Sequence, residues 1–72
     1  MDRITHNPKQ CGGRPCIRGT RVRVSDILDI LAGGATRADI LRDFPYIEDE
    51  DITAALHYAA REAERHAVIA AE

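Results

Sequence analysis

The sequence has few aromatic residues and no long apolar run, and these two shortages limit what the chain does. Among its 72 residues the aromatic side chains are Phe44, Tyr46 and Tyr58, and tryptophan is absent. So few large side chains provide little material for the walls of a deep ligand cavity. No apolar run reaches about 18 residues, the length of a membrane span, and no apolar segment of a signal peptide follows Met1. We therefore expect one small domain in the cytoplasm, without membrane association.

The sequence also lacks the motifs of catalysis, nucleotide binding and metal binding. The glycine pairs at 12–13 and 33–34 stand without the strand, the spacing and the lysine of a phosphate-binding loop. Cys11 and Cys16 are separated by four residues, which is neither the spacing of a redox dithiol nor that of half a zinc site. We expect no enzymatic activity, no cofactor and no metal. A metal site at His6, Cys11 and Cys16 is the alternative.

A chain of this length has a small core. Domains near this size bury only about 60% of the surface that the unfolded chain exposes. The apolar residues here are mostly Ala, Ile, Leu and Val. We therefore expect a homodimer, or a partner that completes the core.

The formal net charge of −2 conceals opposite charges in the two parts of the chain. Residues 1–24 hold six basic residues against one acid, a balance of +5. Residues 25–72 hold four arginines against eleven acids, a balance of −7. Such a division predicts two partners of different chemistry. Attraction between the two parts within a dimer is the alternative.

Residues 1–24 predict a basic extended arm or β-ribbon, because turn-forming Gly, Pro and Asn interrupt any helical pattern. Short extended segments are expected at 3–5, 16–18 and 21–24. In the last segment Val22 and Val24 alternate with two arginines, the period of a strand with one buried face. Gly19 is expected to supply the positive φ of a tight bend.

Residues 25–66 predict a core of three helices with a helix-turn-helix-like layout. The first helix is expected to begin with Ser25 as its N-cap and to end at the glycine pair 33–34. The second begins with Thr36, which forms a capping box with Asp39, and stops before Pro45. The third starts near 48–50 and runs to about residue 66 or beyond. Overall the fold is predicted to be mainly α, with a short N-terminal β-ribbon.

The third helix is expected to face the core with small and branched residues at steps of three and four. These residues are Ile52, Ala55, Leu56, Ala59, Ala63 and Ala67. Residues 67–72 form an apolar tail that either frays or is covered by a partner.

Nucleic acid, if bound, is expected to meet the basic arm rather than the third helix. Helix-turn-helix proteins usually place the start of the last helix in the major groove. Here that segment is 48–51, a run of four acids that phosphates would repel. A two-stranded basic ribbon fits a major groove, and a dimer doubles its cations. The residues expected to contact DNA are Arg14, Arg18, Arg21 and Arg23. Pairing of some of these arginines with the acidic helices is the alternative.

The same residues resemble a known family, the domain of unknown function 433 family. The similar stretches are residues 4–8, 11–24, Gly34, Phe44-Pro45 and 51–56. The stretch Gly13–Arg21 is the most specific of them, and the resemblance extends roughly from Arg3 to Ala60. At the start of the third helix the family often has Ser or Thr, whereas this chain has Glu48.

This resemblance implies a function. Members resemble antitoxins of VapBC-like type II toxin–antitoxin pairs, often encoded beside a toxin with a PIN-like ribonuclease domain. An antitoxin needs one surface for its operator DNA and another for its toxin. We expect the basic arm to bind operator DNA, and the last helix with its tail to bind the toxin. The residues expected at the toxin interface are Tyr58, Arg61, Arg65, Val68 and Ile69. The alternatives are a non-catalytic protein-interaction module and a small transcriptional regulator without a toxin.

Overall fold

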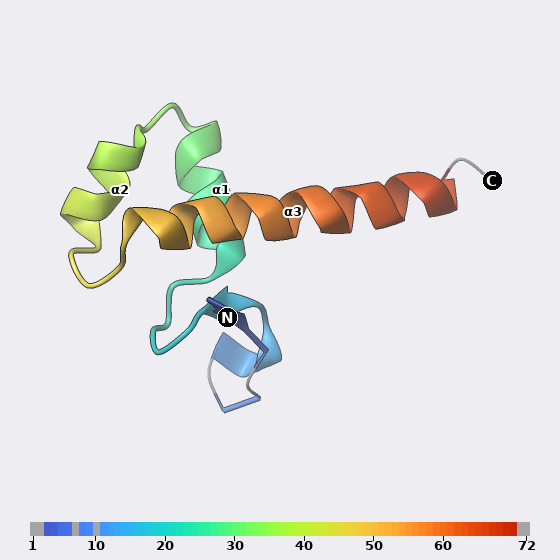
Figure 1. Cartoon of the computed structure of the whole chain (residues 1–72), viewed down its shortest axis with the longest axis horizontal. Helices are drawn as coiled ribbons and strands as arrows, with labels where there is room; N and C mark the ends of the chain where they lie inside the picture. The colour runs from blue at the N-terminus through green and yellow to red at the C-terminus, as the bar shows by residue number, and fades with distance from the viewer. Residues whose placement is uncertain (1–2, 7, 10, 71–72) are drawn as a thin grey trace.

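Three helices and a short two-stranded ribbon make up the fold (Figure 1). The computed structural model describes residues 3–6, 8–9 and 11–70, and for Cys11 and 66–70 it describes the backbone alone. The elements are β1 (Ile4–Thr5), the 3-10 turn η1 (Cys11–Gly13), β2 (Cys16–Ile17), α1 (Val24–Ala32), α2 (Arg37–Asp43) and α3 (Asp49–Ala70). The predicted fold class, mainly α with an N-terminal β-ribbon, is confirmed. Within the described residues, no helix is both long and apolar enough to cross a bilayer.

The ribbon is built around β2. β1 pairs with it antiparallel, with Ile4 opposite Ile17. On the other side of β2 the chain folds back through residues 18–21, and the Ile17 N–H donates to the Val22 carbonyl at 2.8 Å. Gly19 has a φ of +79° in this turn, a left-handed conformation that favours glycine. The tight bend predicted at Gly19 is therefore confirmed.

The extended segment predicted over 21–24 is shorter than expected. Its pairing is reduced to a single bridge between Cys16 and Arg23. Val22 and Val24 are both 3% exposed, so the predicted alternation of buried and exposed residues is confirmed. The segment ends early because α1 already begins at Val24.

The prediction of Ser25 as the N-cap of the first helix is wrong, because Arg23 occupies that position. The Asp26 carboxylate accepts a hydrogen bond from the Arg23 N–H at 3.1 Å and also contacts the Arg23 guanidinium. The Val24 N–H, in turn, donates to the Pro15 carbonyl at 3.0 Å. These bonds start the helix before Ser25, whose side chain is exposed.

The boundaries of α2 and α3 follow local signals in the sequence. The Thr36 hydroxyl accepts from the Asp39 N–H at 3.1 Å, and the Asp39 carboxylate accepts from the Thr36 N–H at 2.9 Å. The predicted capping box is confirmed. At the start of α3 the Glu48 N–H donates to the Asp51 carboxylate at 2.8 Å. The predicted start of the third helix near 48–50 is confirmed as well.

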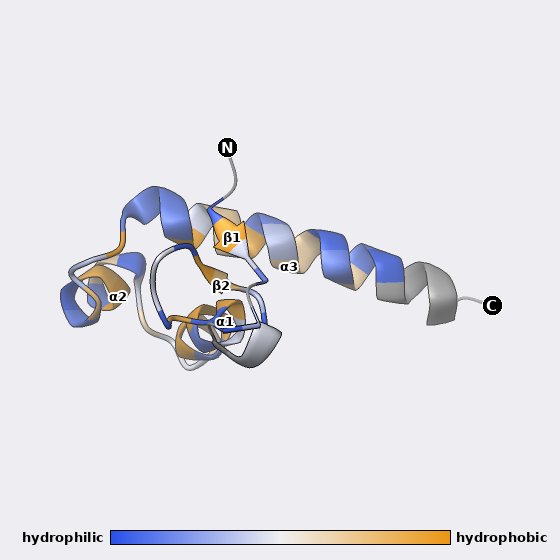
Figure 2. Ribbon diagram, turned by 90° about the horizontal axis from the view of Figure 1, so that it is seen from below, coloured by the Kyte–Doolittle hydropathy of each residue, from blue (hydrophilic) through white to orange (hydrophobic). Residues whose placement is uncertain are grey.

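The core lies under the first half of α3, which packs against α1, α2 and β1. Figure 2 shows the hydrophobic parts of β1, β2 and α1 gathered beside this half of the helix. The buried cluster consists of Ile17, Val22, Val24, Ile27, Ile40, Ile47, Ile52 and Ala55. The helix has 22 residues and spans about 33 Å at 1.5 Å per residue. Its C-terminal half projects away from the other elements (Figure 1).

The expected inner stripe of the third helix is partly wrong. Ile52 and Ala55 are fully buried, but Leu56 is 38% exposed. Tyr58 packs against the core instead. Successive helical side chains are rotated by about 100°, so a face centred on Asp51 and Ala55 includes position 58 and leaves out position 56. Further along, Ala63 is exposed, and the side chain of Ala67 lies outside the described part.

Candidate functional site: a basic hairpin loop and a groove along α3

Arg3 joins the N-terminal segment to the start of α3. Its guanidinium nitrogen lies 2.8 Å from a Glu48 carboxylate oxygen and 2.9 Å from an Asp51 carboxylate oxygen. These hydrogen bonds, first that to Glu48, raise the pKa of Arg3 above its ordinary value. Asp51 is only 7% exposed, so the ion pair forms at the edge of the core. Analysis of the sequence missed this contact, because no local pattern links residues 48 positions apart.

Arg37 contacts the same acidic turn and offsets part of its negative charge. Its Nε lies 2.8 Å from an Asp49 carboxylate oxygen, and its NH2 group donates to the Asp49 carbonyl and the Thr53 hydroxyl. The hydrogen bond between the side chains lowers the pKa of Asp49 and raises that of Arg37. The run 48–51 is therefore less repulsive to anions than four free carboxylates, although two arginines leave it net negative.

The four arginines expected to bind DNA do not form one continuous strip. Arg18 and Arg21 lie together in the exposed turn 18–21, which we term the hairpin loop. Arg14 is also exposed, but it precedes Pro15 at the opposite end of the hairpin, about 13 Å of extended chain from Arg18. Arg23 lies 3.3 Å from a carboxylate oxygen of Asp26.

Most other arginines of the described residues contact acids. Arg42 lies near Asp39 and Asp43, and Arg65 lies 3.0 Å from Glu62. By contrast, no described carboxylate is within ion-pair distance of Arg14 or Arg21. Among the described residues of the arm, Arg14 and Arg21 are thus exposed cations without a carboxylate beside them.

The residues expected at the toxin interface occupy two environments. Tyr58 is half-buried beside the ribbon, where its hydroxyl lies 2.8 Å from Nε2 of His6. Arg61 and Arg65 are exposed further along α3. Val68 and Ile69 belong to the backbone of α3, but their side chains lie outside the described part. Tyr58 is thus separated from the projecting half of the helix and belongs to the body of the fold.

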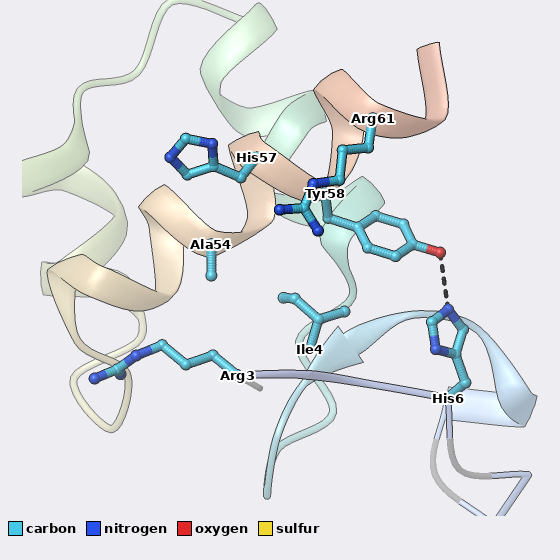
Figure 3. Close-up of a pocket in the computed structure, with 7 residues that line it drawn as sticks. All are labelled: Arg3, Ile4, His6, Ala54, His57, Tyr58 and Arg61. Atoms are coloured by element: carbon cyan, nitrogen blue, oxygen red, sulfur yellow. Dashed lines mark hydrogen bonds between the residues drawn. The ribbon is translucent and has the colours of Figure 1, made fainter. Parts of the chain in front are cut away.

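Tyr58 also lies between two grooves. The first groove, of about 500 Å³, runs between β1 and α3 and is shown in Figure 3. It is lined by Arg3, Ile4, His6, Ala54, His57, Tyr58 and Arg61. The second, of about 350 Å³, lies between the segment before β2 and the helices α1 and α3. It is lined by Arg14, Pro15, Val24, Ser25, Leu28, Tyr58, Ala59 and Glu62. No feature of the sequence indicated either groove.

The cysteines do not form a described metal or redox site. Cys16 is a buried free thiol whose Sγ lies 3.7 Å from the Thr20 carbonyl oxygen. The side chain of Cys11 lies outside the described part. The alternative metal site at His6, Cys11 and Cys16 is therefore not tested by the structure. In the part of the chain that is described, no three His, Cys, Asp or Glu residues are placed to hold a metal ion.

These features define a three-helix domain with an N-terminal ribbon, and comparison with known proteins assigns it to a family. The sequence profile of the family described as "Protein of unknown function (DUF433)" matches residues 4–59. The chain belongs to this family, which confirms the resemblance seen in the sequence.

One curated relative and one solved structure support this assignment. The "Uncharacterized protein y4eO" of Sinorhizobium fredii is 38% identical over 56 residues, which cover 78% of this chain and 25% of that protein. The chain thus spans about a quarter of the length of this relative. The crystal structure of a DUF433 member protein from Anabaena variabilis has a TM-score of 0.83 and 30% sequence identity. That match covers 100% of this chain and 71% of the other.

The ion pair between Arg37 and Asp49 predicts a pH-dependent contribution to stability. The contact holds the pKa of Asp49 below its ordinary value of 3.8, so the folded protein binds this proton less readily than the unfolded chain. Its stabilisation is complete above the unfolded pKa and is lost as the pH falls through the folded pKa. We expect Arg37→Gln to lower the urea midpoint at pH 7, and the difference from the parent to shrink as the pH falls below 3.8, while the bonds of Arg37 to the Asp49 carbonyl and the Thr53 hydroxyl keep part of it.

The control is Arg21→Gln, which removes an exposed arginine without a described carboxylate partner. We expect it to show no such pH-dependent difference. An Arg37→Gln deficit of equal size at pH 7 and pH 2.5 would contradict the assignment to Asp49.

Proposed function

We propose that this protein is the antitoxin of a type II toxin–antitoxin pair and acts as a homodimer in the cytoplasm. The hairpin loop binds operator DNA, and the projecting half of α3 neutralises a PIN-like ribonuclease toxin. The antitoxin class follows from the family resemblance. The assignment of DNA and toxin to two surfaces rests on one observation. The exposed arginines of the hairpin loop lie in a different part of the fold from the projecting part of α3.

The chemistry of the hairpin loop supports the DNA-binding part of the proposal. Arg18 and Arg21 are three residues apart in a turn, and both side chains are exposed. Guanidinium groups bind phosphate oxygens and guanine edges with two parallel hydrogen bonds. A homodimer presents two such loops, which suits the two half-sites of a palindromic operator. Arg14 adds an exposed cation on the same arm.

The shape and charge of α3 support the toxin-binding part. A helix that projects from the body offers side chains on all of its faces to a groove in a partner. The described residues of this segment carry both signs of charge: Arg61, Glu62, Glu64 and Arg65 lie within five residues. A ribonuclease that binds RNA presents positive charge around its carboxylate metal site. Such a surface is complementary either to acidic side chains of the helix or, at the metal-binding carboxylates, to an arginine.

The DNA-binding part is tested by titrating the full chain onto the DNA upstream of its own reading frame at several salt concentrations. We expect the double variant Arg18→Gln/Arg21→Gln to bind more weakly. The slope of log K against log salt should flatten by up to about 2 per protomer, because each phosphate contact contributes about 0.9.

The matched control is Arg42→Gln/Arg65→Gln, which changes the net charge equally but removes arginines that contact acids on α2 and α3. We expect this control to keep most of the parent slope. Equal effects of both double variants would refute a role for the hairpin loop. Absence of any binding at low salt would favour the protein-interaction module.

The toxin-binding part is tested by co-expression with the neighbouring reading frame. We expect the full chain to co-purify with that product and to rescue growth. Deletion of residues 64–72 should abolish both effects, because it removes the projecting end of α3 and leaves the core intact. The truncated protein should still bind the upstream DNA. Loss of both activities, or an undiminished complex, would contradict the proposal, and a non-toxic neighbour would favour a regulator without a toxin.

A further inference from the structure

The groove between β1 and α3 is lined by basic and imidazole side chains from both elements, together with apolar and aromatic ones (Figure 3). Ile4, Ala54 and the Tyr58 ring provide the apolar surface. The remaining lining residues are Arg3, His6, His57 and Arg61, and none of the seven is acidic. Apart from Tyr58, the polar side chains of the lining are therefore two guanidinium groups and two imidazole rings, which carry N–H donors for an anion. Such a lining favours an anionic ligand with an apolar part.

Arg61 is the cation that a ligand in this groove would meet first. Arg3 already contacts Glu48 and Asp51, which balance its charge. Arg61, in contrast, has no carboxylate of the described residues within ion-pair distance. The adjacent Glu62 contacts Arg65 and lines the second groove instead of this one. Figure 3 shows the Arg61 side chain turned back toward Tyr58, so that its guanidinium lies over the groove.

Tyr58 packs against the core and is also held by His6. Its hydroxyl lies 2.8 Å from Nε2 of His6, and the centroids of the two rings are 5.5 Å apart. This bond fixes the orientation of an aromatic ring beside the guanidinium of Arg61. A fixed aromatic ring next to a basic side chain is the combination that binds nucleobases and their phosphates in sites without sequence preference. The volume of about 500 Å³ suits one nucleotide rather than a duplex.

We propose that this groove binds a single phosphorylated nucleoside, either free or at the end of a nucleic-acid strand. Arg61 contacts the phosphate, His57 lies at the rim beside it, and the base stacks on Tyr58. The site lies outside the hairpin loop, because neither Arg18 nor Arg21 lines it. The inference therefore goes beyond operator binding, and either one stands or fails without the other.

The test is a calorimetric and NMR titration of the full chain with 5′-AMP, with adenosine and inorganic phosphate as comparison ligands. We expect saturable binding of 5′-AMP, with the largest shifts at His6, His57 and Tyr58. Adenosine and phosphate should each bind at least about tenfold more weakly, because each lacks one half of the contacts. Phosphate that binds as tightly as 5′-AMP would reduce the groove to a simple anion site and overturn the proposal.

The decisive variant is Arg61→Gln, which removes the cation that faces the phosphate. We expect it to weaken 5′-AMP binding by about tenfold or more, the loss of one charge-assisted hydrogen bond. The matched control is Arg65→Gln, one turn further along α3 and outside the groove, which should bind within about twofold of the parent. Both variants alter exposed side chains, so folding is preserved. Equal affinities of the two variants, or no saturation by 5′-AMP at about 10 mM, would refute the proposal.

Two further experiments distinguish free nucleotides from strand ends, and nucleotide binding in the groove from DNA binding at the hairpin loop. Displacement of 5′-AMP by a short 5′-phosphorylated oligonucleotide, but not by the same strand without its phosphate, assigns the groove to strand ends. Absence of displacement by either strand assigns it to free nucleotides. The variant Arg18→Gln/Arg21→Gln should bind 5′-AMP as the parent does. Loss of 5′-AMP binding in that variant would place the nucleotide at the hairpin loop and contradict the site proposed here.

Discussion

The ion pairs of Arg3 with Glu48 and Asp51 join the N-terminal segment to the start of α3. Through them, β1 is fixed against the helix that covers the core, and β2 in turn pairs with β1. The same Asp51 carboxylate accepts the Glu48 N–H and so starts α3. A nearly buried carboxylate that loses its cationic partner is costly. This ion pair thus ties the ribbon to the start of the long helix, together with the packing of Ile4 against the core and the contact of His6 with Tyr58.

The same ion pair shows that the positive and negative parts of the sequence contact each other in the folded chain. The positive arm and the negative helices are not two separate bodies, because Arg3 and Arg23 of the arm contact acids of α3 and α1. The cations of the arm whose residues are exposed are Lys9, Arg14 and, in the hairpin loop, Arg18 and Arg21. The expected attraction between the two parts thus occurs within one chain for some arginines. The proposed DNA contact rests on those that remain exposed.

Local signals predicted the helices, whereas the contacts that build the sites came from distant residues. The capping box of Thr36 and Asp39 and the bend at Gly19 each depend on a few consecutive residues, and the structure confirms both. The contacts of His6 with Tyr58 and of Arg3 with Asp51 join residues about 50 positions apart. The spacing of apolar residues along the sequence does not reveal contacts between residues so far apart, so the groove between β1 and α3 could not be predicted. At the N-cap of α1 the prediction failed for another reason: the Asp26 carboxylate bonds back to Arg23, so the helix begins before Ser25.

The most direct test of this account is a double-mutant cycle on Arg3 and Asp51, measured by urea unfolding and by amide exchange in β1. We expect Arg3→Gln and Asp51→Asn each to lower the free energy of unfolding and to accelerate exchange at Ile4 and Thr5. The double variant should lose clearly less than the combined losses of the two single variants, because the second change removes a partner that is already unpaired. Additive losses, with exchange in β1 unchanged, would show that the ribbon does not depend on this ion pair.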